Sequence, residues 1–193
     1  LSIDADMTPM AAPAPATGTV YTVTNTANSG AGSLRQAITD ANGHAGADTI
    51  WFNISGTGVK TITLTSALPS ITGSTVLDAT SQPGFAGSPL IRLDGNSTEE
   101  VSGLVLSSTS DGSLIRGLII TRVDADGIRI QSGANDITIA GNWIGTEGSG
   151  TTGVGNGDDG LDIAAVRGAM QRGRMKGVPD KVAAMLTEPC MDD

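Results

Sequence analysis

The chain has 193 residues, enough for one domain with its own core, and only 3% are aromatic, so any core must be mainly aliphatic. A formal net charge of −9 argues against nucleic-acid binding, which requires a basic surface. No apolar run reaches the length of about 18 residues that a membrane-spanning helix needs. The single cysteine, Cys190, excludes an intrachain disulfide framework.

The chain opens on a leader and then becomes β-rich. Residues 1–18 are small, alanine-rich and proline-rich, a composition typical of a flexible arm. Residues 19–26 (TVYTVTNT) alternate and are rich in β-forming types, which predicts the first strand. Turns rich in glycine, proline and serine separate the further predicted strands, at 49–53, 61–65, 75–78 and 90–94.

A short helix is predicted after the first strand. Ser33 and Gln36 form a capping box, in which the Ser33 hydroxyl accepts from the Gln36 N–H and the Gln36 side chain reaches back to Ser33. The apolar residues that follow lie on one helical face: Leu34, Ala37, Ile38 and Ala41. We expect a helix over residues 33–42 that covers the open N-terminal end of a β core.

Two interleaved repeats follow. Segments that begin at Gly103, Gly127 and Gly160 share the order glycine, apolar, variable, apolar; the second lies 24 residues after the first, and the third 33 residues after the second. Residues 115–120 and 139–144 share another pattern, again 24 apart. Short alternating runs at such a period indicate stacked strands rather than stacked helices. The sequence therefore predicts an all-β, right-handed parallel β-helix over residues 19–163, a solenoid of about 24 residues per coil.

The repeat register brings carboxylates together. It places Asp126 over Asp159, with Asp124 and Asp158 nearby and Glu147 in the inserted loop. Stacked carboxylates repel, and a hard cation such as Ca²⁺ relieves that repulsion. The alternative, which we favour, is that Asp-Gly pairs turn the chain at the same place in each coil. No EF-hand loop or nonapeptide calcium repeat is present in the sequence.

The same register aligns Trp143 with Ile119 at an outward position, where an aromatic could bind a sugar ring or pack under the inserted loop 145–157. It also stacks Arg129 on Asp162, which predicts a structural ion pair of a few tenths of a kcal/mol. Asn142 is expected to hydrogen-bond a turn within the core. His44, the only histidine, is interpreted as solvated, because no Ser or Cys context supports a triad.

Beyond residue 163 the alternation stops, and methionines and basic residues crowd together. We interpret residues 164–193 as an atypical tail, either a native C-terminal cap or a foreign segment, and favour the second. An uncovered end of a β stack would pair with another copy, so we expect self-association through that end.

Three stretches carry a family resemblance: residues 21–26, residues 32–38 (GSLRQAI) and residues 46–52. Together they resemble the CSLREA domain, which opens many secreted or surface-displayed bacterial and archaeal proteins with pectin-lyase-like β-helix repeats. Gly32 stands where the motif has Cys, and Gln36 where it has Glu. Residues 141–147 and 155–160 resemble repeats that follow this domain. The resemblance implies a secreted or cell-surface location and no particular reaction.

Three classes of function remain. We favour a non-catalytic structural or adhesive N-terminal module of a secreted or cell-surface β-helix protein, whose partners would be surface or matrix glycans. The alternatives are a carbohydrate-active β-helix enzyme, lyase or hydrolase, and a carbohydrate-binding module. The enzyme class is disfavoured because only one long insertion is available to build a cleft, and no basic residue is clearly paired with the acidic group.

Overall fold

The computed structural model describes residues 18–95, 101–146 and 153–164. The predicted leader and tail, apart from residues 18 and 164, lie outside these described residues, as does Glu147.

The described chain forms three sheets in which every strand pair is parallel. The five-stranded sheet contains, in spatial order, β1 (Val20–Val23), β2 (Asp48–Phe52), β4 (Thr75–Asp78), β7 (Leu114–Arg116) and β10 (Thr138–Ala140). The four-stranded sheet contains β11 (Trp143–Ile144), β8 (Leu118–Thr121), β5 (Ile91–Asp94) and β3 (Lys60–Thr63). The three-stranded sheet contains β12 (Leu161–Ile163), β9 (Ile128–Ile130) and β6 (Leu104–Leu106). The predicted β-rich chain with parallel strand pairing is confirmed.

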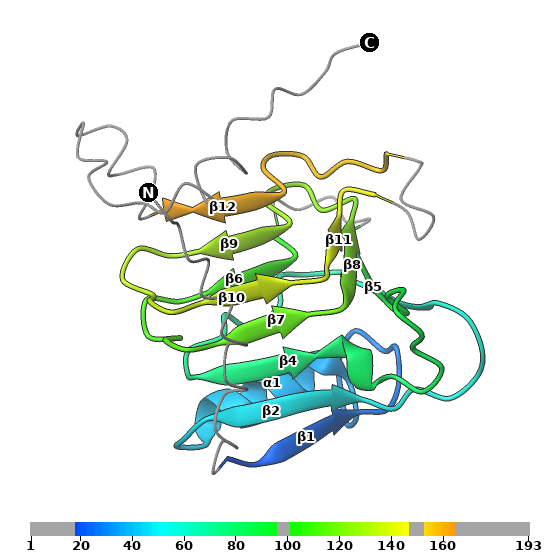
Figure 1. Cartoon of the computed structure of the whole chain (residues 1–193), viewed down its shortest axis with the longest axis horizontal. Helices are drawn as coiled ribbons and strands as arrows, with labels where there is room; N and C mark the ends of the chain where they lie inside the picture. Colours follow the sequence, from blue (N-terminus) through cyan, green and yellow to red (C-terminus); the bar gives the residue numbers. More distant parts are fainter. Residues whose placement is uncertain (1–17, 96–100, 147–152, 165–193) are drawn as a thin grey trace, which may run out of the picture.

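From β4 onward the chain visits the three sheets in rotation. The successive rounds are β4–β5–β6, β7–β8–β9 and β10–β11–β12, and Figure 1 shows β4, β7 and β10 stacked in one column. Leu104 pairs with Ile128, and Ile128 pairs with Leu161, so the predicted register holds across both the 24-residue and the 33-residue offset. The nine extra residues are therefore accommodated in a connection, outside the strands.

The core lies between the sheets and is almost entirely aliphatic. Strand residues alternate between this core and the outside, so that in β9 Ile128 and Ile130 are buried while Arg129 is exposed. Phe52 is the largest buried side chain among the described residues. At the end near β12 the burial weakens, because Leu161 is only partly buried.

One helix, α1 (Leu34–Gly43), packs against β1 and β2 at the opposite end of the stack (Figure 1). Its predicted apolar stripe is confirmed, since Leu34, Ala37, Ile38 and Ala41 are all buried. The capping box forms only in part. Ser33 Oγ accepts from the Gln36 N–H at 3.2 Å, but Gln36 Nε2 donates to Asp40 Oδ1 at 2.7 Å, so the predicted return bond to Ser33 is wrong.

The guanidinium of Arg35 fixes α1 to two loops. It donates to the carbonyl oxygens of Asn28, Ser66 and Ala67. A short 3₁₀ turn, η1 (Ala79–Ser81), follows β4. Neither of the helices that the structure describes has the length and apolar character needed to cross a lipid bilayer.

Candidate functional site

Three of the predicted acidic residues lie together at the turns before β9 and β12. Carboxylate oxygens of Asp126, Asp158 and Asp159 all lie within 4.8 Å of one another. The strand register causes this, because the Gly127 N–H donates to the Asp159 carbonyl at 2.8 Å and the Asp159 N–H donates to Asp126 Oδ1 at 3.3 Å. Asp126 is buried, Asp159 is half-buried and Asp158 is exposed, so the group opens to solvent on one side.

Asp124 is not part of this carboxylate group. The side chain of Asp124 is exposed, and its backbone packs closely against Gly157. A Cβ at position 157 would lie 2.3 Å from the Asp124 carbonyl oxygen. The connection before β12 can therefore approach Asp124 only because residue 157 is glycine.

Asp162 is a further carboxylate beside the group, and the sequence analysis assigned it only to an ion pair. Burial raises the pKa of Asp162, the neighbouring charges of Asp126 and Asp158 raise it further, and Arg129 lowers it. Arg129 Nε lies 3.6 Å from Asp162 Oδ2, which confirms the predicted pairing. Oxygen ligands clustered in this way suit a hard cation such as Ca²⁺, and Asp126, Asp158 and Asp159 are the residues that could hold it.

The two residues considered for ligand binding are neighbours in register, since Trp143 pairs with Ile119. Ile119 is fully buried, however, so its side chain offers no surface to a ligand. Trp143 is half-buried, and residues 147–152 of the loop expected to cover it lie outside the described residues. The sequence analysis missed Trp51, which is 47% exposed on the outer face of β2. Its alternation with the buried Ile50 and Phe52 could have revealed it.

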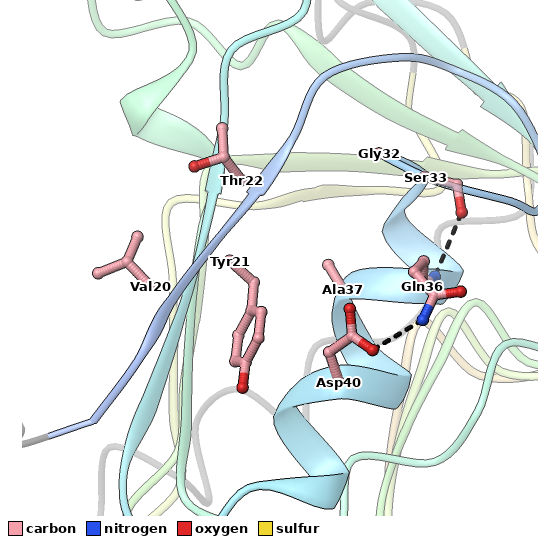
Figure 2. A pocket seen from close by; sticks show the side chains of 8 residues that line it. All are labelled: Val20, Tyr21, Thr22, Gly32, Ser33, Gln36, Ala37 and Asp40. Atoms are coloured by element: carbon pink, nitrogen blue, oxygen red, sulfur yellow. Dashed lines mark hydrogen bonds between the residues drawn. The ribbon is translucent and has the colours of Figure 1, made fainter.

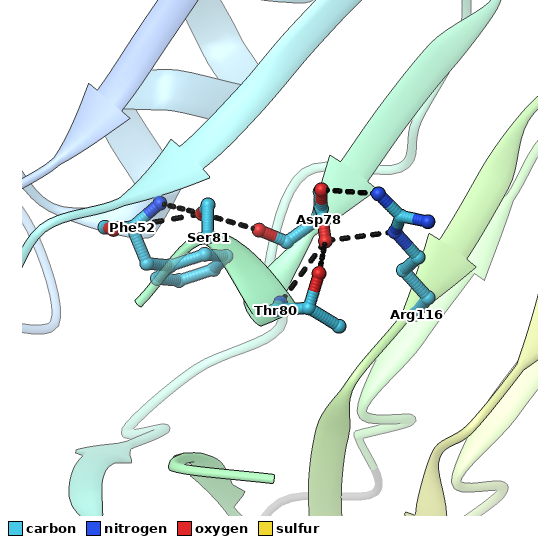
Figure 3. Close-up of polar contacts among 5 residues, drawn as sticks. All are labelled: Phe52, Asp78, Thr80, Ser81 and Arg116. Atoms are coloured by element: carbon cyan, nitrogen blue, oxygen red, sulfur yellow. Dashed lines mark hydrogen bonds and ion pairs between the residues drawn. The ribbon is translucent and has the colours of Figure 1, made fainter. Parts of the chain in front are cut away.

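An ion pair on the same sheet lies beside Trp51. Trp51 is aligned in register with Asp78. Asp78 is in turn aligned with Arg116, and Figure 3 shows these two side chains in contact. Arg116 Nε and Nη2 donate to the two carboxylate oxygens of Asp78 at 2.8 and 2.6 Å, and the N–H and hydroxyl of Thr80 also donate to Asp78. Burial alone would raise the pKa of Asp78, but these hydrogen bonds outweigh it and lower the pKa. Arg122 makes a similar bidentate contact with Asp94.

His44 is exposed, as expected from the sequence, and it also has two polar partners. Its Nδ1 lies 3.0 Å from Asp48 Oδ1, and its Nε2 lies 3.3 Å from Thr19 Oγ1. The Thr19 N–H also donates to Asp48 Oδ1, at 2.8 Å. No short sequence motif predicts this arrangement, because Thr19 precedes β1, His44 follows α1 and Asp48 begins β2.

A groove of about 210 Å³ runs between β1 and α1 (Figure 2). On the strand side it is lined by Val20, Tyr21 and Thr22, and on the helix side mainly by Gln36 and Asp40. Figure 2 shows the Tyr21 ring directed into the space between strand and helix. Thr19 precedes the lining residue Val20, and His44 follows the last residue of α1, so these two residues lie beside the groove and not in its lining.

No family model, curated protein or solved structure matches this chain. The resemblance to the CSLREA domain therefore depends on the motif residues alone.

Proposed function

We propose that this chain is a non-catalytic structural or adhesive module, the N-terminal, helix-capped start of a right-handed parallel β-helix in a secreted or cell-surface protein. The resemblance of residues 32–38 to the CSLREA motif supports the family, the location and the position at the N-terminal end of a longer stack.

The rotation of the chain through three parallel sheets supports the solenoid. Three successive rounds keep the same order of sheets. Each of the three sheets also contains residues 24 apart that are paired in register: Leu114 with Thr138, Ile119 with Trp143 and Leu104 with Ile128. Each round buries its apolar residues only against the rounds beside it, as the units of a repeat protein do. Such a stack is stiff along its axis, which suits a stalk.

The difference between the two ends of the stack is the observation that carries the function. At the first end α1 covers the core. At the other end β10, β11 and β12 each have a described neighbour on one side only, and Ile139, Ile144 and Leu161 are only partly buried there. Strand edges without a described neighbour, beside partly buried apolar side chains, favour the addition of further strands, from the same protein or from a second copy.

Self-association through that end is tested by light scattering over a range of concentrations. We expect oligomers to form as concentration rises. Replacement of Ile163 in β12 by lysine should reduce them, because the charge would be buried in the contact. A matched control is Val59→Lys, which changes an exposed valine far from that end. A wild-type protein that stays monomeric at high concentration would contradict this part of the proposal.

A carbohydrate-binding role is the second candidate, and the exposed Trp51 favours it. An exposed tryptophan offers a flat apolar surface, and the ion pair of Asp78 and Arg116 lies in register beside it, about two strand spacings or roughly 10 Å across the face. The hydrogen bonds from Arg116 to Asp78 use Nε and Nη2, so Nη1 can donate to an acceptor group of a ligand. The partners would be cell-surface or matrix glycans.

A glycan array, together with cleavage assays on polygalacturonate and alginate, separates the candidates. A purely structural module shows neither binding nor turnover, and an adhesive or carbohydrate-binding module shows binding that Trp51→Ala removes while Trp143→Ala does not. Release of unsaturated products would instead establish a polysaccharide lyase and overturn the non-catalytic proposal.

A further inference from the structure

We propose that Thr19, His44 and Asp48 form a nucleophile–base–carboxylate relay that transfers acyl groups from small, uncharged esters to water. This activity would be additional to the structural role and would remove only the word non-catalytic from the proposed function. It concerns the helix-capped end of the molecule, away from the strand edges on which the structural proposal rests.

The distances place the three groups in one chain of hydrogen bonds. Asp48 Oδ1 contacts His44 Nδ1 at 3.0 Å, and His44 Nε2 contacts Thr19 Oγ1 at 3.3 Å. The Asp48 side chain is only 1% exposed, whereas that of His44 is 43% exposed. The carboxylate is thus held inside the protein, and the base and the hydroxyl can be reached from solvent.

The protonation of the ring follows from the partners. An ionised carboxylate only accepts hydrogen bonds, so Nδ1 of neutral His44 must carry the proton that it donates to Asp48. Nε2 then has its lone pair directed at the Thr19 hydroxyl, which is the arrangement that a general base needs. Asp48 is a positioning residue here, because it fixes the tautomer and orientation of His44.

The backbone holds Thr19 in place. Its N–H donates to Asp48 Oδ1 at 2.8 Å, and its carbonyl accepts from the Thr49 N–H at 2.9 Å. Gly18, just before it, packs so closely that a Cβ would lie 1.6 Å from the Ala47 carbonyl oxygen. The nucleophile therefore sits on a fixed piece of backbone, which shortens the search for a reactive geometry.

Charge stabilisation is available from the next peptide. The Thr19 carbonyl faces β2, and the N–H of the same peptide unit, which belongs to Val20, points the opposite way, to the edge of β1 that has no described neighbour. A backbone N–H next to the nucleophile can donate to the oxyanion of a tetrahedral intermediate. Val20 also lines the groove between β1 and α1, which lies next to the relay.

The reaction balances with water as the only co-reactant. His44 Nε2 takes the proton from Thr19 Oγ1 as that oxygen bonds to the ester carbonyl carbon. The carbon–oxygen bond to the alcohol then breaks, and His44 returns the proton to the departing alkoxide. Water, deprotonated by His44, attacks the Thr19 ester, releases the carboxylic acid and restores the hydroxyl. The carboxylates of Asp40, which lines the groove, and of Asp48, which contacts His44, disfavour anionic substrates.

The test uses the full chain with two probes, p-nitrophenyl acetate and a biotinylated fluorophosphonate. We expect slow release of p-nitrophenol and covalent labelling that peptide mapping assigns to Thr19. Thr19→Ala should remove both, and Thr19→Ser should increase both, because a primary hydroxyl is less hindered. His44→Gln should lower both by about 10²-fold or more. Asp48→Asn should lower turnover too, because it removes the acceptor that fixes the tautomer.

Thr63→Ala serves as the matched control, since Thr63 is exposed on β3 and lies outside the relay, and it should leave both signals unchanged. Melting temperatures identify variants that fail to fold. Thr19→Ala and Thr19→Ser retain the backbone bonds and keep the test decisive if the other variants unfold. Absence of wild-type labelling, or labelling that survives Thr19→Ala, would overturn the relay and show that the three residues only fasten β1 to α1.

Discussion

Leu161 lies beside Ile128 in a parallel ladder, although 33 residues separate them instead of the 24 that separate Ile128 from Leu104. Ile128 is fully buried in the middle of this column, whereas Leu161 at its end is only partly buried. Ile128→Ala should therefore lower the free energy of unfolding by about 2–5 kcal/mol, and Leu161→Ala by clearly less. Urea denaturation measures both, and equal losses would contradict the column.

The glycines that precede the strands of the three-stranded sheet permit close stacking. A Cβ at Gly127 would lie 2.5 Å from Ile144 Cγ2 and 2.6 Å from the Gly160 carbonyl oxygen. Gly127→Ala should thus force neighbouring rounds of the chain apart and lower the free energy of unfolding by about 1–3 kcal/mol. Gly43→Ala is the control, because nothing lies within 4 Å of the added Cβ, and thermal melts should show it to be neutral or slightly stabilising.

The contact of Arg116 with Asp78 should be visible in the pH dependence of stability. The pKa of Asp78 is lowered in the folded state, so its ionised form stabilises the fold at pH values above the ordinary aspartate pKa of about 3.9. This stability is lost as pH falls through the lower, folded-state pKa. Arg116→Met should reduce stability at pH 7 and flatten the acid limb of a plot of melting temperature against pH. An unchanged acid limb would contradict the assignment.

Asp162 should change the stability of the fold with pH in the direction opposite to Asp78. Its folded-state pKa is raised by burial and by the charges of Asp126 and Asp158, so protonation favours folding. The stabilisation is complete below the ordinary aspartate pKa and is lost as pH rises through the raised value. Asp162→Asn should therefore increase the melting temperature at pH 7, and its advantage should shrink in acid. A lower melting temperature at pH 7 would contradict this.

Calcium binding at the acidic group is tested by titration calorimetry and by melting in millimolar Ca²⁺. A site formed by Asp126, Asp158 and Asp159 should raise the melting temperature, and a ligand at ten times its Kd adds about 1.4 kcal/mol. Asp158→Asn combined with Asp159→Asn should remove the effect, and Asp136→Asn, an exposed position in another turn, should not. If titration with Ca²⁺ released no heat and did not change the melting temperature, the calcium site would be contradicted and the carboxylates would be explained by Asp-Gly turns alone.

Local pattern was enough to predict much of the fold. The capping serine and apolar stripe of α1, the register of Leu104 with Ile128 and of Trp143 with Ile119, and the pairing of Arg129 with Asp162 all follow from residue spacing, because parallel strands in successive rounds repeat one alternation. The grouping of Asp126 with Asp159 follows from the same offset. Asn142 accepts from the Leu118 N–H and donates to the Ile115 carbonyl within the stack, which matches expectation too.

Only the tertiary structure decided which side chains are covered and which groups meet across irregular offsets. It buried Ile119, exposed Trp51 and joined Asp78 to Arg116 over 38 residues. It also brought Thr19, His44 and Asp48 together. Strand alternation repeats along the chain and can therefore be predicted from the sequence. These contacts instead depend on how loops of unequal length bring separate elements together, and the sequence has no regular spacing that predicts this.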